Sequence, residues 1–386
     1  MAQIHWLTII FLHLHVISLF AQKTPIDVVL DKKERSVKSV DQIVSDYQLI
    51  PLILKEDLFI SEISKVLVHG DNIYVMDSES NRLFQFDKRG RFLKTIGSLG
   101  ENLNEYRDIS DFDLDSKGNI YIASNRSWAI FKYNSKGEFV KKISTGTSAI
   151  KYFALLSDEV MLFTTNQFDD DFRNLLAINQ DGKVITKMFP FGKGQMERSF
   201  AFTGGLRKSG KHLLYMEPAS CKLLLIKRIQ GKIYDEVGFR INLGKNMWNC
   251  DDPIDVQAFW KYAQKMHEAF SYVRNDVLLT DNHLFLGYYE NLKMNNALYR
   301  IKDRQIAVLR ELTPSLLKYA IHYNPVKGVY GDQFIFGVNE ELWFYLKKEA
   351  EKIGFLPAID DTFMKELPKI SGDGNDPPYL LFVQFK

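Results

Sequence analysis

The chain has 386 residues, of which 46% are hydrophobic and 25% are charged, a balance typical of a folded globular protein. Its formal net charge of only +2 at pH 7, without a long block of lysine or arginine, argues against a nucleic-acid-binding surface. Aromatic residues make up 13% of the chain, and because they favour strands, the composition leans toward an all-β fold.

The N-terminus has the pattern of a secretory signal peptide. Residues 1–21 contain no Asp, Glu, Lys or Arg, and their apolar stretch ends in a small residue, Ala21. Cleavage there would place the mature protein in the periplasm or outside the cell. No cysteine lies near this stretch, so attachment of a lipid at a lipobox is not expected. An uncleaved membrane anchor is the alternative, although His13 and His15 interrupt the run and it is short for a span.

The mature chain is expected to contain a mobile leader and one domain. Residues 22–45 are polar without periodicity, and residues 46–386 are assigned to the domain. The domain begins with a predicted strand over 47–54, in which Pro51 favours an edge position. No later segment is apolar enough to predict a membrane span.

An internal repeat determines the predicted architecture. Ile73-Tyr74-Val75, followed by a turn at Gly90, returns as Ile120-Tyr121-Ile122 with a turn at Gly137, and both landmarks move by 47 residues. Repeats of this length that carry several short strands are typical of β-propeller blades, because one blade cannot bury its own faces.

The hairpin turns extend the repeat along the chain. Asp87 to Gly90 and Asn134 to Gly137 begin with Asp or Asn and end with Gly, which predicts a type I turn closed by a left-handed glycine. Gly182 and Gly231 mark the same turn in a third and a fourth blade.

Two more degenerate blades complete the prediction. Residues 277–301 fit a fifth blade, and residues 328–336 together with 379–385 fit a sixth. We expect the strand at 47–54 to return and complete the sixth blade, which would close the ring and remove free sheet edges. The predicted fold class is therefore all-β, a six-bladed β-propeller with short helical insertions. These insertions are expected at 252–270, 314–323 and 339–353, with Asp252, Thr313 and Asn339 as their caps.

The sequence contains only two cysteines, Cys221 and Cys250. Two cysteines do not make a disulfide framework, and Cys221 lies in an apolar run that is typical of a buried strand. The sequence favours a buried free thiol, and a bridge between the two is the alternative.

Part of the chain resembles a known family. The residues that carry the resemblance run from Glu62-Ile63-Ser64-Lys65 through Asp71 to Asp77 and Phe84 to Asp87, and on to Ile109 to Asp115. They are similar to the secreted six-bladed β-propellers of Gram-negative gut-type bacteria, relatives of the NHL-repeat propellers. The family usually has Gly-Pro-Gly-Glu-Tyr where this chain has Asn102 to Tyr106. The resemblance implies a six-bladed fold and an extracytoplasmic location, and it implies no catalytic residues.

Candidate binding residues follow from the propeller prediction. Loops that join second to third strands, and one blade to the next, gather on one face around the central channel. Exposed aromatic, arginine and carboxylate side chains there suit recognition of a glycan, peptide or protein. The residues chosen on this basis are Glu79, Arg82, Glu105, Tyr106, Arg107, Arg126, Trp128 and Asp170.

No motif in the chain predicts catalysis. It contains neither a Gly-x-Ser-x-Gly elbow nor a His-Glu-x-x-His helix, and no histidines are spaced as a metal pair. Asp169-Asp170-Asp171 lacks the spaced ligands and the turn glycine of a calcium loop, so neither a metal nor another cofactor is expected. The favoured function is a non-catalytic binding or scaffold propeller. The alternative is a carbohydrate-active hydrolase or lyase, because a pair of distant carboxylates leaves no local signature.

Overall fold

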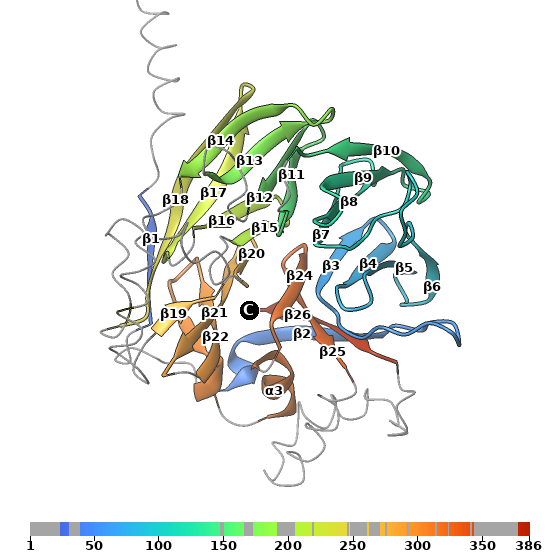
Figure 1. Cartoon of the computed structure of the whole chain (residues 1–386). Helices are drawn as coiled ribbons and strands as arrows, with labels where there is room; N and C mark the ends of the chain where they lie inside the picture. Colours follow the sequence, from blue (N-terminus) through green and yellow to red (C-terminus); the bar gives the residue numbers. More distant parts are fainter. Residues whose placement is uncertain are drawn as a thin grey trace, which may run out of the picture.

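The computed structural model of the chain shows a six-bladed β-propeller (Figure 1). It describes residues 24–30, 39–146, 150–165, 173–190, 205–217, 220–244, 247, 261, 271–274, 276–291, 293–312, 315–322, 324–339, 342 and 377–386. Within these residues no helix is both long and apolar enough to cross a membrane.

The first two blades follow the predicted repeat. Blade one consists of β3 (Lys65–His69), β4 (Asn72–Asp77), β5 (Arg82–Asp87) and β6 (Phe92–Thr95). Blade two consists of β7 (Asp111–Leu114), β8 (Ile120–Ser124), β9 (Ala129–Tyr133) and β10 (Phe139–Ser144). Both sheets are antiparallel meanders, so strand order in space equals strand order in the chain.

Blades three to five vary this plan. Blade three consists of β11 (Phe153–Ser157), β12 (Val160–Thr164), β13 (Arg173–Asn179) and β14 (Val184–Pro190). Blade four contains β15 (Gly205–Ser209), β16 (His212–Met216), β17 (Lys222–Ile229) and β18 (Lys232–Asn242). Blade five contains β19 (Ser271–Val273), β20 (Leu278–Leu279), β21 (His283–Glu290), β22 (Lys293–Arg300) and β23 (Ile306–Val308). β19 and β20 both pair with β21.

Blade six joins the two ends of the propeller. It consists of β24 (Val326–Tyr330), β25 (Gln333–Val338), β26 (Tyr379–Phe385) and β2 (Val44–Pro51). β2 pairs antiparallel with β26 from Val44 opposite Phe385 to Pro51 opposite Tyr379. The predicted closure of the ring by an N-terminal strand is therefore confirmed, and β2 is the edge strand that Pro51 favours.

The innermost strands of the blades form a complete ring around the channel. β3, β7, β11, β15, β20 and β24 each contact the next in this order, and β24 contacts β3 (Figure 1). The C-terminal ends of β3, β7, β11, β15 and β24 line one pocket, which places them at one mouth of the channel and the beginnings of these strands toward the other mouth.

The hydrophobic core lies between the blades. One buried cluster joins Tyr74 and Leu83 of blade one to Phe112 and Phe131 of blade two. The next cluster joins Tyr121 of blade two to strands of blade three. Each sheet therefore covers its neighbour, as the repeat predicted.

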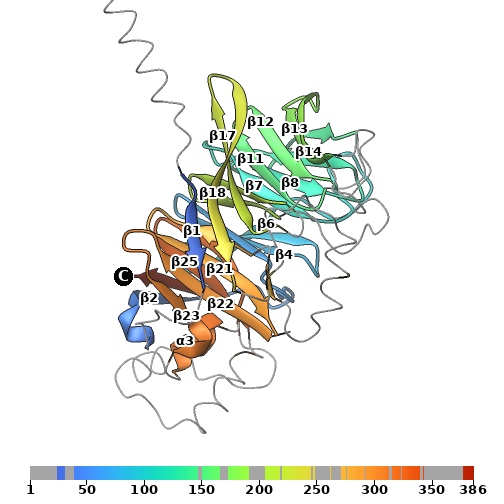
Figure 2. The same cartoon turned by 90° about the vertical axis from the view of Figure 1, so that its left-hand side faces the viewer.

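The N-terminal segment differs from the expected leader. Within residues 22–45, β1 (Ile26–Val29) pairs in parallel with β18 and extends blade four (Figure 2). Val28 and Leu30 are buried in one cluster with Phe239 and Ile241, which explains why this segment docks. A 3₁₀ turn, η2 (Val40–Gln42), then leads into β2.

The described helices agree with the predicted insertions where they can be compared. α3 (Leu316–His322) lies within the helix predicted over 314–323, and η4 (Leu309–Glu311) precedes it. The backbone N–H of Leu342 donates to Asn339 Oδ1 at 3.0 Å, the bond expected of an N-cap. Nearly all of the helix predicted over 252–270 lies outside the described residues.

The expectation of a free thiol at Cys221 is corrected by the structure. Cys221 is buried, as its apolar surroundings predicted, but it is disulfide-bonded. The only other cysteine of the sequence, Cys250, lies outside the described residues. A hydrophobic pattern in the sequence predicts that Cys221 is buried, but it does not predict whether the thiol forms a disulfide.

The predicted turn glycines all adopt left-handed conformations, with φ of 77° at Gly90, 80° at Gly137, 81° at Gly182 and 80° at Gly231. Gly90 has a second constraint, because a Cβ there would lie 1.8 Å from the carbonyl oxygen of Pro51. Its turn therefore packs directly against the strand that closes the ring.

We expect Gly90→Ala to lower the free energy of unfolding by about 2–4 kcal/mol, since it combines left-handed strain with a clash against β2. Gly231→Ala is the matched control. Gly231 has nearly the same φ, yet nothing lies within 4 Å of the added Cβ, so about 1–2 kcal/mol is expected. Urea unfolding of both variants measures the difference, and equal losses would show that the contact with Pro51 is unimportant.

Candidate functional site

Two aspartates on β7 organise the polar interior of the channel. Asp111 accepts the backbone N–H of Phe153 at 2.9 Å, and Asp113 accepts the backbone N–H of Leu155 at 2.8 Å. Both donors belong to β11, the innermost strand of the next blade. The two carboxylates thus satisfy strand-edge N–H groups that no neighbouring strand pairs, and they join blades two and three.

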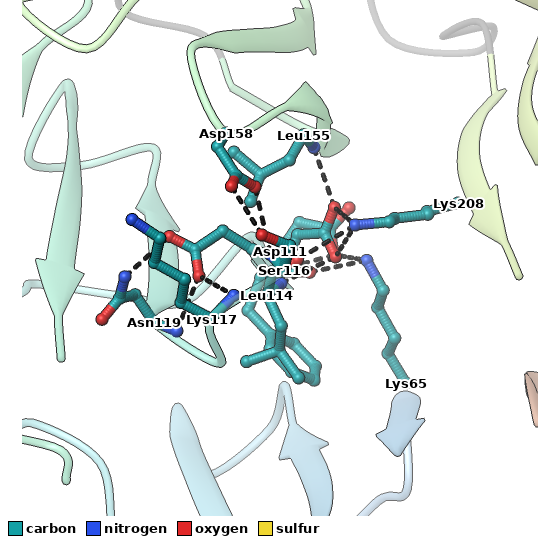
Figure 3. A network of polar contacts seen from close by, with 12 residues as sticks. Lys65, Asp111, Leu114, Ser116, Lys117, Asn119, Leu155, Asp158 and Lys208 are labelled. Carbon is teal, nitrogen blue, oxygen red and sulfur yellow. Dashed lines mark hydrogen bonds and ion pairs between the residues drawn. The ribbon is translucent and has the colours of Figure 1, made fainter. Parts of the chain in front are cut away.

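Two lysines reach these aspartates from other blades. Lys65 of β3 donates to Asp111 Oδ1 and to the carbonyl of Phe112, both at 2.7 Å (Figure 3). Lys208 of β15 lies 3.2 Å from the Asp113 carboxylate and donates to the carbonyl of Leu114 at 3.0 Å. The network therefore connects the innermost strands of four consecutive blades. Lys65 and both aspartates are buried, whereas the side chain of Lys208 is 29% exposed.

The exposed end of this network borders a pocket of about 600 Å³. The pocket lies at the mouth where the innermost strands end, and strands and turns of five blades contribute to it. Its apolar wall is formed by Leu67, Leu155, Leu156, Leu213, Ile226, Ile229 and Val329. Its polar side chains are His69, Asp113, Asp115, Ser116, Ser157, Asp158, Lys208, Lys211, His212, Lys227 and Arg228.

Hydrogen bonds hold the pocket rim in place. Asp158 accepts both the hydroxyl of Ser116 at 2.6 Å and its backbone N–H at 3.1 Å (Figure 3). These two bonds, with smaller contributions from Lys117 and Lys208, lower the pKa of the Asp158 carboxyl. The rim therefore holds an ionised carboxylate in a fixed position near neutral pH.

Basic side chains also contribute to the rim. Lys211 and His212 both contact the Asp281 carboxylate, at 2.8 and 3.2 Å. Arg228 contacts Ser157 at 3.1 Å and Glu159 at 2.7 Å. These groups combine positive charge with an apolar wall, an arrangement that suits a polar ligand with hydroxyl or acidic groups.

The pocket carboxylates do not form a free catalytic pair. Asp113 accepts bonds from Leu114, Leu155 and Lys208, and Asp115 accepts bonds from Lys117 and Asn119. Asp158 is ionised and bonded to Ser116. Glycoside hydrolysis uses a protonated carboxyl group facing a second carboxylate. The three pocket carboxylates already accept hydrogen bonds from protein donors and do not present that arrangement. Among the described residues, no group of three or more His, Cys, Asp or Glu side chains is placed to hold a metal ion.

The predicted site residues that the structure describes, all except Asp170, lie at the other mouth, where the innermost strands begin. Three of their loops lie close together. The backbone N–H of Ile109 donates to Asn81 Oδ1 at 3.1 Å, and that of Arg107 donates to the hydroxyl of Ser127 at 3.1 Å. These bonds bring the connections that carry Glu79 and Arg82, Glu105 to Arg107, and Arg126 with Trp128 onto one surface.

The exposure of these side chains differs. Glu79, Arg107, Arg126 and Trp128 are exposed, and the Arg107 guanidinium lies 3.3 Å from Glu101. Glu105 is half-buried and accepts the backbone N–H of Asn102, which is the main cause of the lowered pKa of its carboxyl.

Tyr106 and Arg82 lie deeper than expected. Tyr106 is buried against Phe131 and donates to the carbonyl of Ile96, so it supports the loop rather than facing solvent. Burial raises the pKa of its hydroxyl. Arg82 is half-buried, and its Nη1 atom is buried without a hydrogen-bond partner. Asp170 lies outside the described residues.

Sequence reasoning missed the pocket at the opposite mouth. A signal was present in Asp111-Phe112-Asp113-Leu114-Asp115, where carboxylates alternate along the segment that forms β7. Carboxylates in a buried strand require partners, so the pattern marks a polar channel. It does not identify Lys65 and Lys208 as the partners, because they come from other blades.

A match with one solved structure supports the fold. The chain is similar to the crystal structure of a "Putative exported protein" from Bacteroides fragilis NCTC 9343, with 14% identity, a TM-score of 0.72, and coverage of 94% of this chain and 100% of that one. A member of the duf4221 family from Bacteroides vulgatus ATCC 8482 shares 12% identity with a TM-score of 0.48, covering 89% of this chain and 97% of that one.

A further structural match is virginiamycin B lyase from Staphylococcus aureus, at 13% identity and a TM-score of 0.39, covering 82% of this chain and 78% of the other. No curated protein sequence matches the chain. The family model described as "Domain of unknown function (DUF4934)" matches residues 23–363. Since this match spans most of the chain, the protein belongs to the DUF4934 family.

Proposed function

We propose that this protein is a secreted or periplasmic, non-catalytic binding propeller that holds a polar glycan or peptide ligand in the pocket at the mouth bordered by Lys208 and Asp158. The pocket carries the proposal, since a volume of about 600 Å³ lies within the range of small-molecule sites. The apolar first 21 residues support export.

The lining favours recognition over catalysis. Its apolar wall suits the flat face of a sugar or an aliphatic side chain, and its charged rim supplies directional hydrogen bonds. The carboxylates that a hydrolase would need already accept bonds from protein donors. The rigid network behind the pocket preorganises it, which reduces the entropy lost on binding.

A binding screen with the mature chain, residues 22–386, tests this proposal. Glycan and peptide collections are the probes, and each mixture is also analysed for cleavage products. For a ligand found in the screen, Arg228→Gln is expected to weaken binding by about 10- to 100-fold, since a hydrogen bond to a charged group contributes about 1.5–3 kcal/mol. Lys88→Gln, a change in an exposed ion pair with Asp71, is the control.

The opposite mouth provides the competing location. Trp128→Ala and Arg107→Ala change exposed residues of the loops predicted from sequence. If these variants lose the ligand while Arg228→Gln retains it, the ligand binds at the loops and the pocket proposal is wrong. Cleavage products from the wild-type protein would contradict the non-catalytic role.

A further inference from the structure

A second group of charged side chains lies at the mouth opposite to the pocket, close to the channel. Arg207 is on β15 and Lys327 is near the start of β24. Arg274 and Asp276 precede β20, and Glu62 precedes β3. Four blades therefore direct charged side chains toward the end of the channel where the innermost strands begin.

Asp276 carries the buried carboxylate of this group, and only one of its two oxygen atoms has a partner. Arg274 Nη2 forms an ion pair with Asp276 Oδ2, and both side chains are 13% exposed. Two further polar atoms of the pair, Arg274 Nη1 and Asp276 Oδ1, are buried without hydrogen-bond partners. One donor of Arg274 therefore remains available, although burying an unsatisfied polar atom costs about 1–3 kcal/mol.

The other two cations have weak partners. Lys327 has a side chain only 11% exposed, and its Nζ atom lies 3.9 Å from Glu62, too far for a hydrogen bond. Arg207 lies 4.6 Å above the Tyr152 ring, which orients its guanidinium. Within the described part of the chain, no carboxylate forms an ion pair with Arg207.

The three cations belong to blades four, five and six, whose innermost strands β15, β20 and β24 contact one another in turn. Burial is the largest cause of the lowered pKa of Lys327. The negative charges of Glu62 and Asp276 act in the opposite direction, and the positive charges of Arg207 and Arg274 lower the pKa further. Arg207 and Arg274 also act on the buried carboxyl of Asp276, whose pKa is raised by burial. The group therefore has three cations against two carboxylates, and an anion would compensate the remaining positive charge.

We propose that Arg207, Arg274 and Lys327 form a binding site for an oxyanion, either a carboxylate or a sulfate group, at the mouth opposite to the pocket. Two guanidinium groups suit the spaced oxygens of such a group, and the ammonium adds a point charge. The Tyr152 ring beside Arg207, and Tyr289 with its centroid 5.9 Å from the Arg274 Cζ atom, provide flat surfaces for the rest of the ligand. An acidic or sulfated sugar combines both features.

Titration calorimetry of the mature chain with sodium sulfate and with sodium glucuronate tests the site, using sodium chloride at equal ionic strength and glucose as controls. We expect at least one oxyanion to bind and to raise the Tm, and glucose and chloride to have no such effect. The probe that binds with the higher affinity shows whether the site prefers a sulfate or a carboxylate group.

Arg207→Gln and Lys327→Met are expected to weaken this binding by tenfold or more. Lys211→Gln changes a cation at the other mouth and serves as the matched control, which should leave oxyanion binding unchanged. Without oxyanion, each site variant should unfold cooperatively at a Tm close to that of the wild type. This readout excludes misfolding as the cause of lost binding.

Two results would overturn the inference. One is the absence of any oxyanion effect beyond that of chloride in the wild-type protein. The other is an effect that persists in both Arg207→Gln and Lys327→Met. Because Arg228→Gln tests the pocket at the opposite mouth, failure of this site and failure of the proposed pocket function give different results.

Discussion

Deletion of residues 46–54 is expected to produce an aggregating or poorly folded protein. These residues contain most of β2, which forms the outer strand of blade six. Ile50 and Leu52 are buried between blades six and one, and exposing them costs about 3–6 kcal/mol. That loss is comparable to the 5–15 kcal/mol that separates a typical folded domain from its unfolded chain. The deletion would also leave β26 as an unpaired edge, a site for aggregation.

Removal of residues 22–30 is the matched control for this deletion. It takes away β1, which is added to the outer edge of a blade that already has four strands. The ring stays closed, so we expect a cooperative but less stable protein. Thermal and urea unfolding, together with size-exclusion chromatography, compare the two truncations. A 46–54 deletion that melts as cooperatively as the full mature chain would show that β2 does not close the fold.

The sequence predicted those features of the fold that depend on local chemistry. A left-handed glycine at the end of each hairpin turn, as at Gly90 and Gly137, reflects constraints within a few residues. Strands that alternate between such turns can be recognised even where the blades differ in length. The count of six blades then follows from the number of such repeats, and the return of an N-terminal strand follows from the need to complete the last blade.

Features that depend on distant partners could not be predicted in this way. β1 is only four residues long and pairs with Phe239 to Asn242, far along the chain. Its sequence has no turn signal, so residues 22–45 resembled a polar leader. The disulfide at Cys221 was missed for the same reason, because a covalent partner depends on tertiary structure.

The candidate site likewise combines features that local sequence predicts with features that depend on distant residues. The repeat correctly placed the loops of Glu79, Arg107 and Trp128 on one surface, and whether they bind a ligand stays a prediction. The pocket at the opposite mouth depends on side chains from several blades, including Asp158 and Lys208. Residues that far apart converge only after the ring has closed, which a single repeat cannot show.

The buried ion pair between Lys65 and Asp111 leads to the second large prediction. We expect Asp111→Leu to destabilise the protein by about 3–5 kcal/mol, because it leaves a buried ammonium group without its counter-ion. The backbone N–H of Phe153 also loses its acceptor. Lys65→Met should cost less, since Asp111 would still accept the N–H groups of Phe112 and Phe153.

The double variant separates the ion pair from the bond to β11. Lys65→Met with Asp111→Leu removes both charges, so its loss should be smaller than the sum of the two single losses. The remaining cost, about 1–3 kcal/mol, reflects the unpaired N–H of Phe153. Lys88→Ala in the exposed pair with Asp71 is the control and should change stability by less than about 1 kcal/mol. Urea unfolding of all four variants gives the coupling energy. If the single losses simply add, Lys65 and Asp111 do not act as a pair, and the β7 carboxylates stabilise the channel only through their bonds to β11.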